Sequence, residues 1–141
     1  MITSFSNAEN IFAEVCIERK KLIATKEEQD WYDLKESHSR GVANIGCKIL
    51  AKEQALDKIR SDEDLFVAAK SALLLHDIAR FYQFVNKDII KMDHGMVGSD
   101  LLQTRFRIDN PFVYLPVKYH NKLSLDDSLF VDKDSSKLNL L

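Results

Sequence analysis

The sequence has 141 residues, of which 45% are hydrophobic and 30% charged. This size and composition are usual for one globular domain and exclude a disordered or fibrous chain. The 20 lysines and arginines nearly balance the 22 aspartates and glutamates, giving a formal net charge of −2, so no extended nucleic-acid surface is expected. With only four glycines and two prolines, long helices are favoured over a many-stranded sheet. We therefore expect residues 1–141 to form a single all-α domain, a compact multi-helix bundle.

Two features bear on where the protein resides. The two cysteines, Cys16 and Cys47, do not make a disulfide framework and are expected to be buried, reduced thiols. The N-terminal residues lack the basic and apolar regions of a signal peptide, and no apolar run approaches the length that spans a bilayer. We expect a cytoplasmic protein that does not associate with membranes.

Helices are predicted along most of the chain. Ser6 and Glu9 have the spacing of a capping box and predict a first helix over 7–23, followed by a second over about 28–54. Acidic residues at 61–64 then start a third helix. Because residues 65–84 are apolar on nearly every side, that helix should lie in the middle of the domain.

Two shorter helices follow. Asp93 is expected to cap a helix that ends near Thr104 and turns Met96 inward. Gly95 and Gly98 should allow a close approach of another helix, with a loose helix start as the alternative. Asn110 followed by a proline predicts a last helix over 111–120, bent by its internal Pro116. Residues 123–141 receive no assignment.

The four histidines carry the main functional signal, because each lies on or at the end of a different predicted helix: His38, His76, His94 and His120. Bundles build interior metal sites in this way, with one ligand from each helix. The pair His76-Asp77 also lies in an apolar run, where an unpaired carboxylate would cost several kcal/mol. A divalent ion is one compensation, and imidazole with carboxylate suits Mn, Fe, Co, Ni or Zn, or Mg when fewer nitrogens bind. The alternative is that the histidines are ordinary core or surface residues and that Asp77 pairs with Arg80 or caps a helix.

The same residues carry a family resemblance. The spacing of His38 and His76-Asp77, the segment Asp93-His94-Gly95 and the segment Tyr119-His120-Asn121 resemble the HD superfamily of metal-dependent phosphohydrolases over about residues 30–123. The resemblance implies an HD-type helical fold. It implies that His38, His76 and Asp77 are ligands of a main metal ion, and that His94 and His120 bind a second ion or contact the substrate phosphate. One or two divalent ions are then expected, with Asp77 as the bridge between two.

One element of the family pattern is missing. Family members have a further aspartate on a later helix, and no such segment follows His120 here. The aspartates at 126, 127, 132 and 134 lie in polar sequence without helical context. We expect either a truncated chain or an incomplete site; completion by a tail aspartate is a weaker third alternative, since ligands need rigid support.

The expected activity is hydrolysis of a small phosphate mono- or diester, with a nucleotide favoured, by water activated on the metal. Asp77, Arg80 and Arg40 are the candidate catalytic residues, because an arginine fork suits a phosphate. An ordinary ion pair is an equally good interpretation for Arg40. The alternative function is a catalytically incomplete module that binds a nucleotide, a metal or a protein partner without turnover. The sequence does not indicate an oligomeric state.

Overall fold

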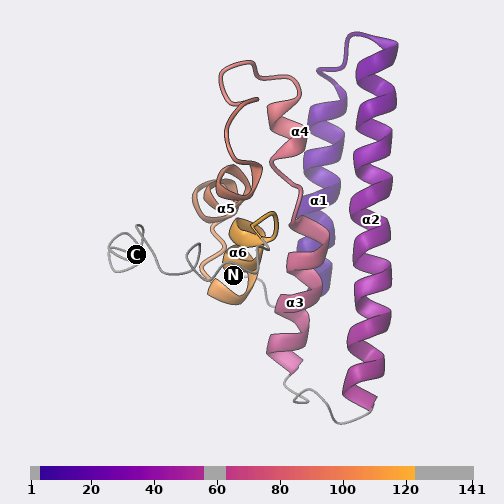
Figure 1. The fold of residues 1–141 in the computed structure, drawn as a ribbon, viewed down its shortest axis with the longest axis vertical. Helices are drawn as coiled ribbons and strands as arrows, with labels where there is room; N and C mark the ends of the chain where they lie inside the picture. The colour runs from indigo at the N-terminus through magenta and orange to yellow at the C-terminus, as the bar shows by residue number, and fades with distance from the viewer. Residues whose placement is uncertain (1–3, 56–62, 123–141) are drawn as a thin grey trace.

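A computed structural model describes residues 4–55 and 63–122, and within these ranges the chain contains helices and no strand. The helices are α1 (Phe5–Lys20), α2 (Lys26–Ala55), α3 (Glu63–Leu75), α4 (Arg80–Gln83), α5 (His94–Thr104) and α6 (Pro111–Tyr119). In Figure 1, α1, α2 and α3 run along the long axis, while α5 and α6 lie to one side and are seen nearly end-on. The predicted all-α bundle is confirmed. The aspartates at 126, 127, 132 and 134 lie outside the described residues.

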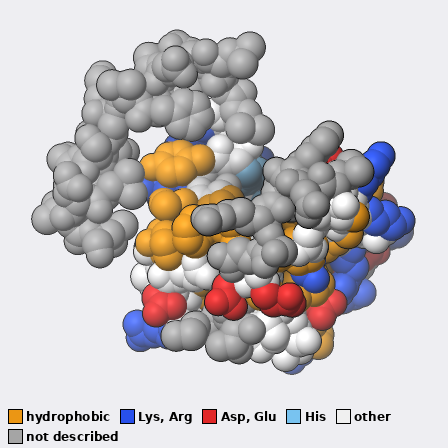
Figure 2. Space-filling model, turned by 90° about the horizontal axis from the view of Figure 1, so that it is seen from below, with side chains coloured by type: hydrophobic (Ala, Val, Ile, Leu, Met, Phe, Trp, Pro, Cys, Tyr) orange, Lys and Arg blue, Asp and Glu red, His pale blue; other side chains and the backbone are white. Residues whose placement is uncertain are grey.

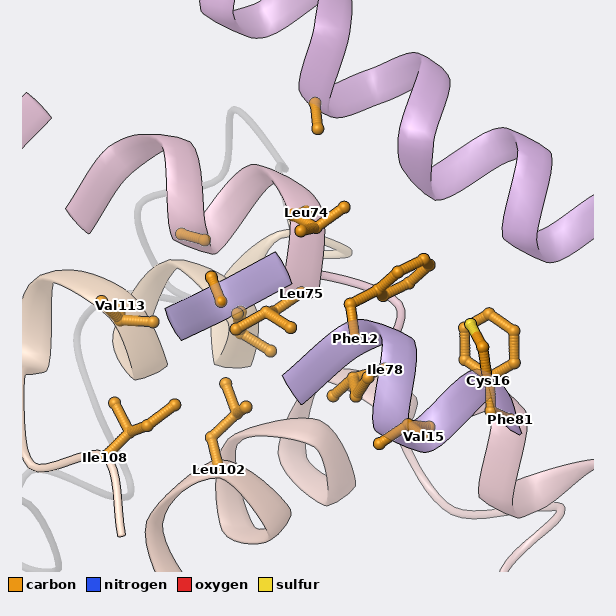
Figure 3. Close-up of a cluster of buried hydrophobic side chains, with 14 of the residues drawn as sticks. Phe12, Val15, Cys16, Leu74, Leu75, Ile78, Phe81, Leu102, Ile108 and Val113 are labelled. Carbon is orange, nitrogen blue, oxygen red and sulfur yellow. The ribbon is translucent and has the colours of Figure 1, made fainter. Parts of the chain in front are cut away.

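Helix α3 lies at the centre, as its all-round apolar sequence predicted. It packs against α1, α2 and α6. Leu74 and Leu75 from its last turn join Phe12 of α1 and Val113 of α6 in one buried cluster (Figure 3). Each such side chain contributes roughly 1.5–3 kcal/mol when it is removed from water. The histidine and aspartate that follow Leu75 are therefore positioned by the best-packed segment of the described chain.

The prediction of one continuous helix over 65–84 is wrong in its middle. Helix α3 ends at Leu75, and residues 76–79 form a turn before the short α4. The His76 ring donates from Nδ1 to the carbonyl of Leu73, 2.8 Å away, which is the carbonyl that would accept the Asp77 amide in a continuing helix. Within the turn, the Ile78 amide donates to the Leu75 carbonyl at 3.1 Å. This bond spans three residues and so closes a tighter turn than the four-residue turn of an α-helix. Apolar residues on both sides of the break concealed it.

Of the three helix caps predicted at Ser6, Asp93 and Asn110, two are present in the structure. Asp93 caps α5 by accepting from the Met96 amide at 2.9 Å, and Asn110 caps α6 by accepting from the Phe112 amide at 2.9 Å. The capping box at Ser6 is wrong, because α1 begins at Phe5 with Ser4 in the cap position. Met96 is also not turned inward, since it is 44% exposed. Pro116 lies inside α6, where it removes one backbone donor.

Aromatic contacts hold the start of α2 in place. Tyr32 is buried, and its hydroxyl donates to the Cys16 carbonyl at 2.5 Å. Trp31 stacks on Phe84, with ring centroids 4.1 Å apart. Both rings pack within the protein, where aromatic side chains contribute large buried areas. His38 follows Tyr32 by six residues on the same helix, so these contacts also fix the position of His38 along the bundle.

The two cysteines are not joined in a disulfide, as the sequence predicted. Cys16 and Cys47 are both free, and Cys16 is buried. Burial raises the pKa of the Cys16 thiol to about 11, so the group stays protonated and unreactive at neutral pH. None of the helices in the described ranges combines the length and hydrophobicity that a bilayer span requires.

Glycine at position 95 allows α5 and α6 to touch. A Cβ atom at Gly95 would collide with the carbonyl of Lys118 and lie 3.0 Å from that of Val117. Both obstacles belong to the backbone and cannot turn aside. The prediction of close helix approach at Gly95 is therefore confirmed, and the contact holds His94 and His120 next to each other.

We expect Gly95→Ala to lower the free energy of unfolding by about 1–3 kcal/mol, because the added methyl overpacks the α5–α6 contact. Gly41→Ala in α2 is the matched control: nothing lies within 4 Å of the added Cβ. There the better helix propensity of alanine should stabilise the protein by about 0.5–1 kcal/mol. Urea denaturation of both variants measures the difference, and equal midpoints would contradict the close approach.

Candidate metal centre

Five side chains that are far apart in the sequence meet at one place. His38 comes from the middle of α2, His76 and Asp77 from the turn after α3, His94 from the first position of α5, and His120 from the residue after α6. Asp77 is 4% exposed and lies between the imidazoles. The expectation that the four histidines converge agrees with this arrangement.

Each oxygen of the Asp77 carboxylate faces one pair of histidines. Oδ1 lies 3.3 Å from Nε2 of His94 and 3.4 Å from Nε2 of His120. Oδ2 lies 3.8 Å from Nε2 of His38 and 3.7 Å from Nε2 of His76. The Nε2 atoms of His94 and His120 are 3.0 Å apart, and those of His38 and His76 are 3.4 Å apart. Two three-residue groups therefore share one carboxylate.

Backbone carbonyls fix the rings of two of these histidines. His76 donates from Nδ1 to the carbonyl of Leu73, and His120 donates from Nδ1 to the carbonyl of Val117 at 2.7 Å. Both acceptors lie three residues earlier, at the end of the helix that precedes the histidine. A neutral ring with a proton on Nδ1 presents a lone pair at Nε2, which here points toward Asp77.

Burial and neighbouring charges set the protonation of the group. Burial lowers the pKa of His76, and burial together with the positive charge of Arg80 lowers that of His94, so both rings stay neutral at pH 7. Burial also opposes protonation of His120, but contact with Asp77 outweighs it and raises the pKa. Burial of Asp77 is likewise outweighed by His120, His76 and Lys35, which hold the pKa of the carboxyl well below its usual range. A charged carboxylate beside the neutral rings of His76 and His94 is a protonation state that favours cation binding.

The donor distances fit a divalent ion. Two nitrogens bound to one ion at about 2.1 Å lie about 3.0 Å apart at right angles and about 3.4 Å apart at the tetrahedral angle. The set of Asp77, His94 and His120 matches this range throughout, with separations of 3.0–3.4 Å. The set of His38, His76 and Asp77 is wider, at 3.4–3.8 Å. The tighter set therefore contains His94 and His120, the two histidines that the family resemblance assigned to a second ion or to the substrate.

Lys35 is a member of the site that sequence reasoning missed. Its ammonium donates to Oδ2 of Asp77 at 3.2 Å, and its side chain is 24% exposed. Lys35 lies three residues before His38 on α2, so both side chains lie on the same helix face. The three-residue spacing between Lys35 and His38 was the sequence signal that could have identified Lys35 as part of the site. A lysine in a charged stretch of helix is normally solvated, which is why the signal was not used.

The two candidate arginines have different surroundings. Arg80 follows the His76-Asp77 turn, and its Nε atom is buried without a hydrogen-bond partner among the described residues. Arg40 pairs with Glu36 at 3.3 Å and lies over the ring of Phe12. Residues two apart on a helix point in different directions, which explains why Arg40 does not follow His38 into the site. The alternative that Asp77 pairs with Arg80 is not what the structure has, because the cation in contact with Asp77 is Lys35.

Comparison with known protein families assigns the chain. The HD domain family matches residues 36–133, which include all four histidines and Asp77. The chain belongs to the HD domain family, whose members are mostly metal-dependent hydrolases. No match was found among curated proteins or among solved structures.

Lys35→Gln is expected to strengthen Mn²⁺ binding about fivefold, because it removes ~1 kcal/mol of repulsion between the ammonium and the incoming ion. Isothermal titration calorimetry measures the affinity. Lys48→Gln, an exposed lysine on the same helix, is the control and should leave the affinity unchanged. Weaker binding in Lys35→Gln would show instead that the lysine supports the site.

Proposed function

We propose that this chain is a metal-dependent phosphohydrolase that cleaves a small phosphate mono- or diester, a class that includes nucleotides. The observation that supports it most is the placement of Asp77, a buried carboxylate with two imidazole nitrogens near each of its oxygens. A buried charge surrounded in this way is costly unless it is paired, and a divalent ion pairs it best.

In this proposal His94, His120 and Asp77 hold one ion, and His38 and His76 share Asp77 with a second. A bound ion would lower the pKa of a water molecule and offset negative charge on the phosphate. Asp77 keeps its negative charge at neutral pH, and the carbonyls of Leu73 and Val117 keep the Nε2 lone pairs of His76 and His120 directed at the site. These hydrogen bonds orient the ligands before substrate arrives.

Two cations beside the cluster would bind the phosphate. The buried Nε of Arg80 has an unused donor. An ion at Oδ2 of Asp77 would replace Lys35 there, and the Lys35 ammonium would then be available to a phosphate oxygen. Positioning and charge stabilisation of this kind are most of what phosphoryl transfer requires from a protein.

A second candidate function is a module that binds a nucleotide, a metal or a protein partner without turnover. Two observations favour it. Asp77 is the sole carboxylate in both metal-binding groups of the described residues, and Lys35 competes with any ion for one of its oxygens. Tight ligand binding without hydrolysis in the presence of Mn²⁺ or Fe²⁺ would support this alternative.

Replacing Asp77 with asparagine keeps the shape of the side chain and removes its charge. We expect bound metal to be lost and kcat/KM for phosphate ester hydrolysis to fall about 100-fold or more, since metal ions supply several kcal/mol of charge stabilisation. Metal analysis and release of inorganic phosphate from p-nitrophenyl phosphate and adenosine monophosphate measure both effects.

Asp100→Asn on the exposed side of α5 is the matched control for this experiment. It should retain the metal and the activity of the unmodified chain. If Asp77→Asn also retained both, the proposed role of the carboxylate would be wrong. Loss of metal in Asp77→Asn, with no hydrolysis by any form of the protein, would favour the binding module.

A further inference from the structure

An open apolar groove of about 590 Å³ adjoins the metal centre. Its walls come from the second half of α2, the length of α3, and α6. Ile49, Leu65 and Phe112 on its walls are 57%, 41% and 61% exposed. Figure 2 views the molecule from the end where α2 finishes and α3 begins, and hydrophobic side chains are exposed there beside a histidine. The volume falls in the range of small-molecule binding sites.

The groove and the metal centre share two residues. His76 and His120 line the groove, and the same two imidazoles have their Nε2 atoms 3.7 Å and 3.4 Å from the Asp77 carboxylate. A phosphate held by a metal ion at Asp77 would therefore have its ester group directed either to solvent or along this groove. The continuity connects the groove to the proposed reaction.

The chemistry of the groove is nearly uniform. Ten of its twelve lining residues are aliphatic, aromatic, proline or glycine, and the two histidines are the exceptions. Among the described residues that line it, there is no serine, threonine, asparagine, glutamine or carboxylate to bind the hydroxyls of a sugar or the edge of a base. Apolar walls without polar partners select against polar groups, because such groups would lose their hydrogen bonds to water.

We propose that the groove binds the ester group of the substrate, and that this group is a hydrocarbon chain or an aromatic ring and not a nucleoside. The inference rests on the proposed phosphohydrolase function and specifies its substrate class. Water would add to phosphorus, the phosphorus–oxygen ester bond would break, and the apolar alcohol would leave with a proton, giving inorganic phosphate. Each methylene buried in the groove should improve kcat/KM about fourfold, the equivalent of ~0.8 kcal/mol.

The direct test is a chain-length series. Hydrolysis of ethyl, butyl, hexyl and octyl phosphate is measured with Mn²⁺, alongside adenosine monophosphate. We expect kcat/KM to rise about fourfold per added methylene until the groove is full. We expect the nucleotide to react no faster than butyl phosphate. A flat series, or a nucleotide that reacts faster than octyl phosphate, would overturn the inference.

Two isoleucines on α2 offer a matched pair of variants. Ile49 lines the groove and is 57% exposed, whereas Ile45 does not line it and is 61% exposed. Because both side chains are largely in water, glutamine at either position should leave the fold intact. Ile49→Gln should reduce the ratio of kcat/KM for octyl phosphate to kcat/KM for ethyl phosphate by about fivefold or more. Ile45→Gln should leave this ratio unchanged, and equal effects of the two variants would contradict the assignment.

Binding measurements separate this inference from the proposed activity. Dissociation constants for ethyl, butyl, hexyl and octyl phosphonate, which are not hydrolysed, are measured by calorimetry with Mn²⁺ present. If no ester is hydrolysed but affinity still rises with chain length and falls in Ile49→Gln, the groove assignment stands and the hydrolase proposal fails. If affinity does not depend on length, the groove assignment fails whatever the activity. If sedimentation shows a dimer that Ile49→Gln alone dissociates, the groove is a subunit interface and the inference is wrong.

Discussion

The negative charge of Asp77 is held in the interior by partners from three separate parts of the bundle. α2 supplies His38 and Lys35, α5 supplies His94, and the end of α6 supplies His120. Removing these partners would leave an isolated carboxylate, which is among the most expensive groups a protein can bury. The packing of α2, α5 and α6 around α3 therefore serves an electrostatic need as well as a hydrophobic one.

Much of the architecture follows from local sequence signals. The caps at Asp93 and Asn110 lie where short polar side chains precede apolar helices, and the all-round apolar pattern of α3 placed it correctly at the centre. Hydrophobic periodicity could not locate the end of α3, because the apolar pattern continues through Ile78 and Ala79, which are fully buried. At the end of that helix, the His76 ring takes the Leu73 carbonyl that the next helical amide would otherwise use. Such a bond depends on a rotamer, and residue order does not encode a rotamer in any simple way.

The candidate site was predictable to the extent that it is made of rare residues. Four histidines, one for each of four segments, and one aspartate in an apolar context are conspicuous in a chain of this size, and the family match supports their interpretation. Common residues were not predictable in the same way. Lys35 enters the site and Arg40 pairs with Glu36, although both are basic residues close to His38 on α2. Only the direction in which each side chain leaves the helix distinguishes them.

The carbonyls of Leu73 and Val117 each connect the end of a helix to one imidazole of the candidate metal centre. Each carbonyl accepts a hydrogen bond from Nδ1 of the histidine three residues later, so the backbone of the last turn determines which ring nitrogen carries the proton. Loss of either bond would free the ring to exchange its proton between the two nitrogens, and a proton on Nε2 would block that atom as a metal ligand.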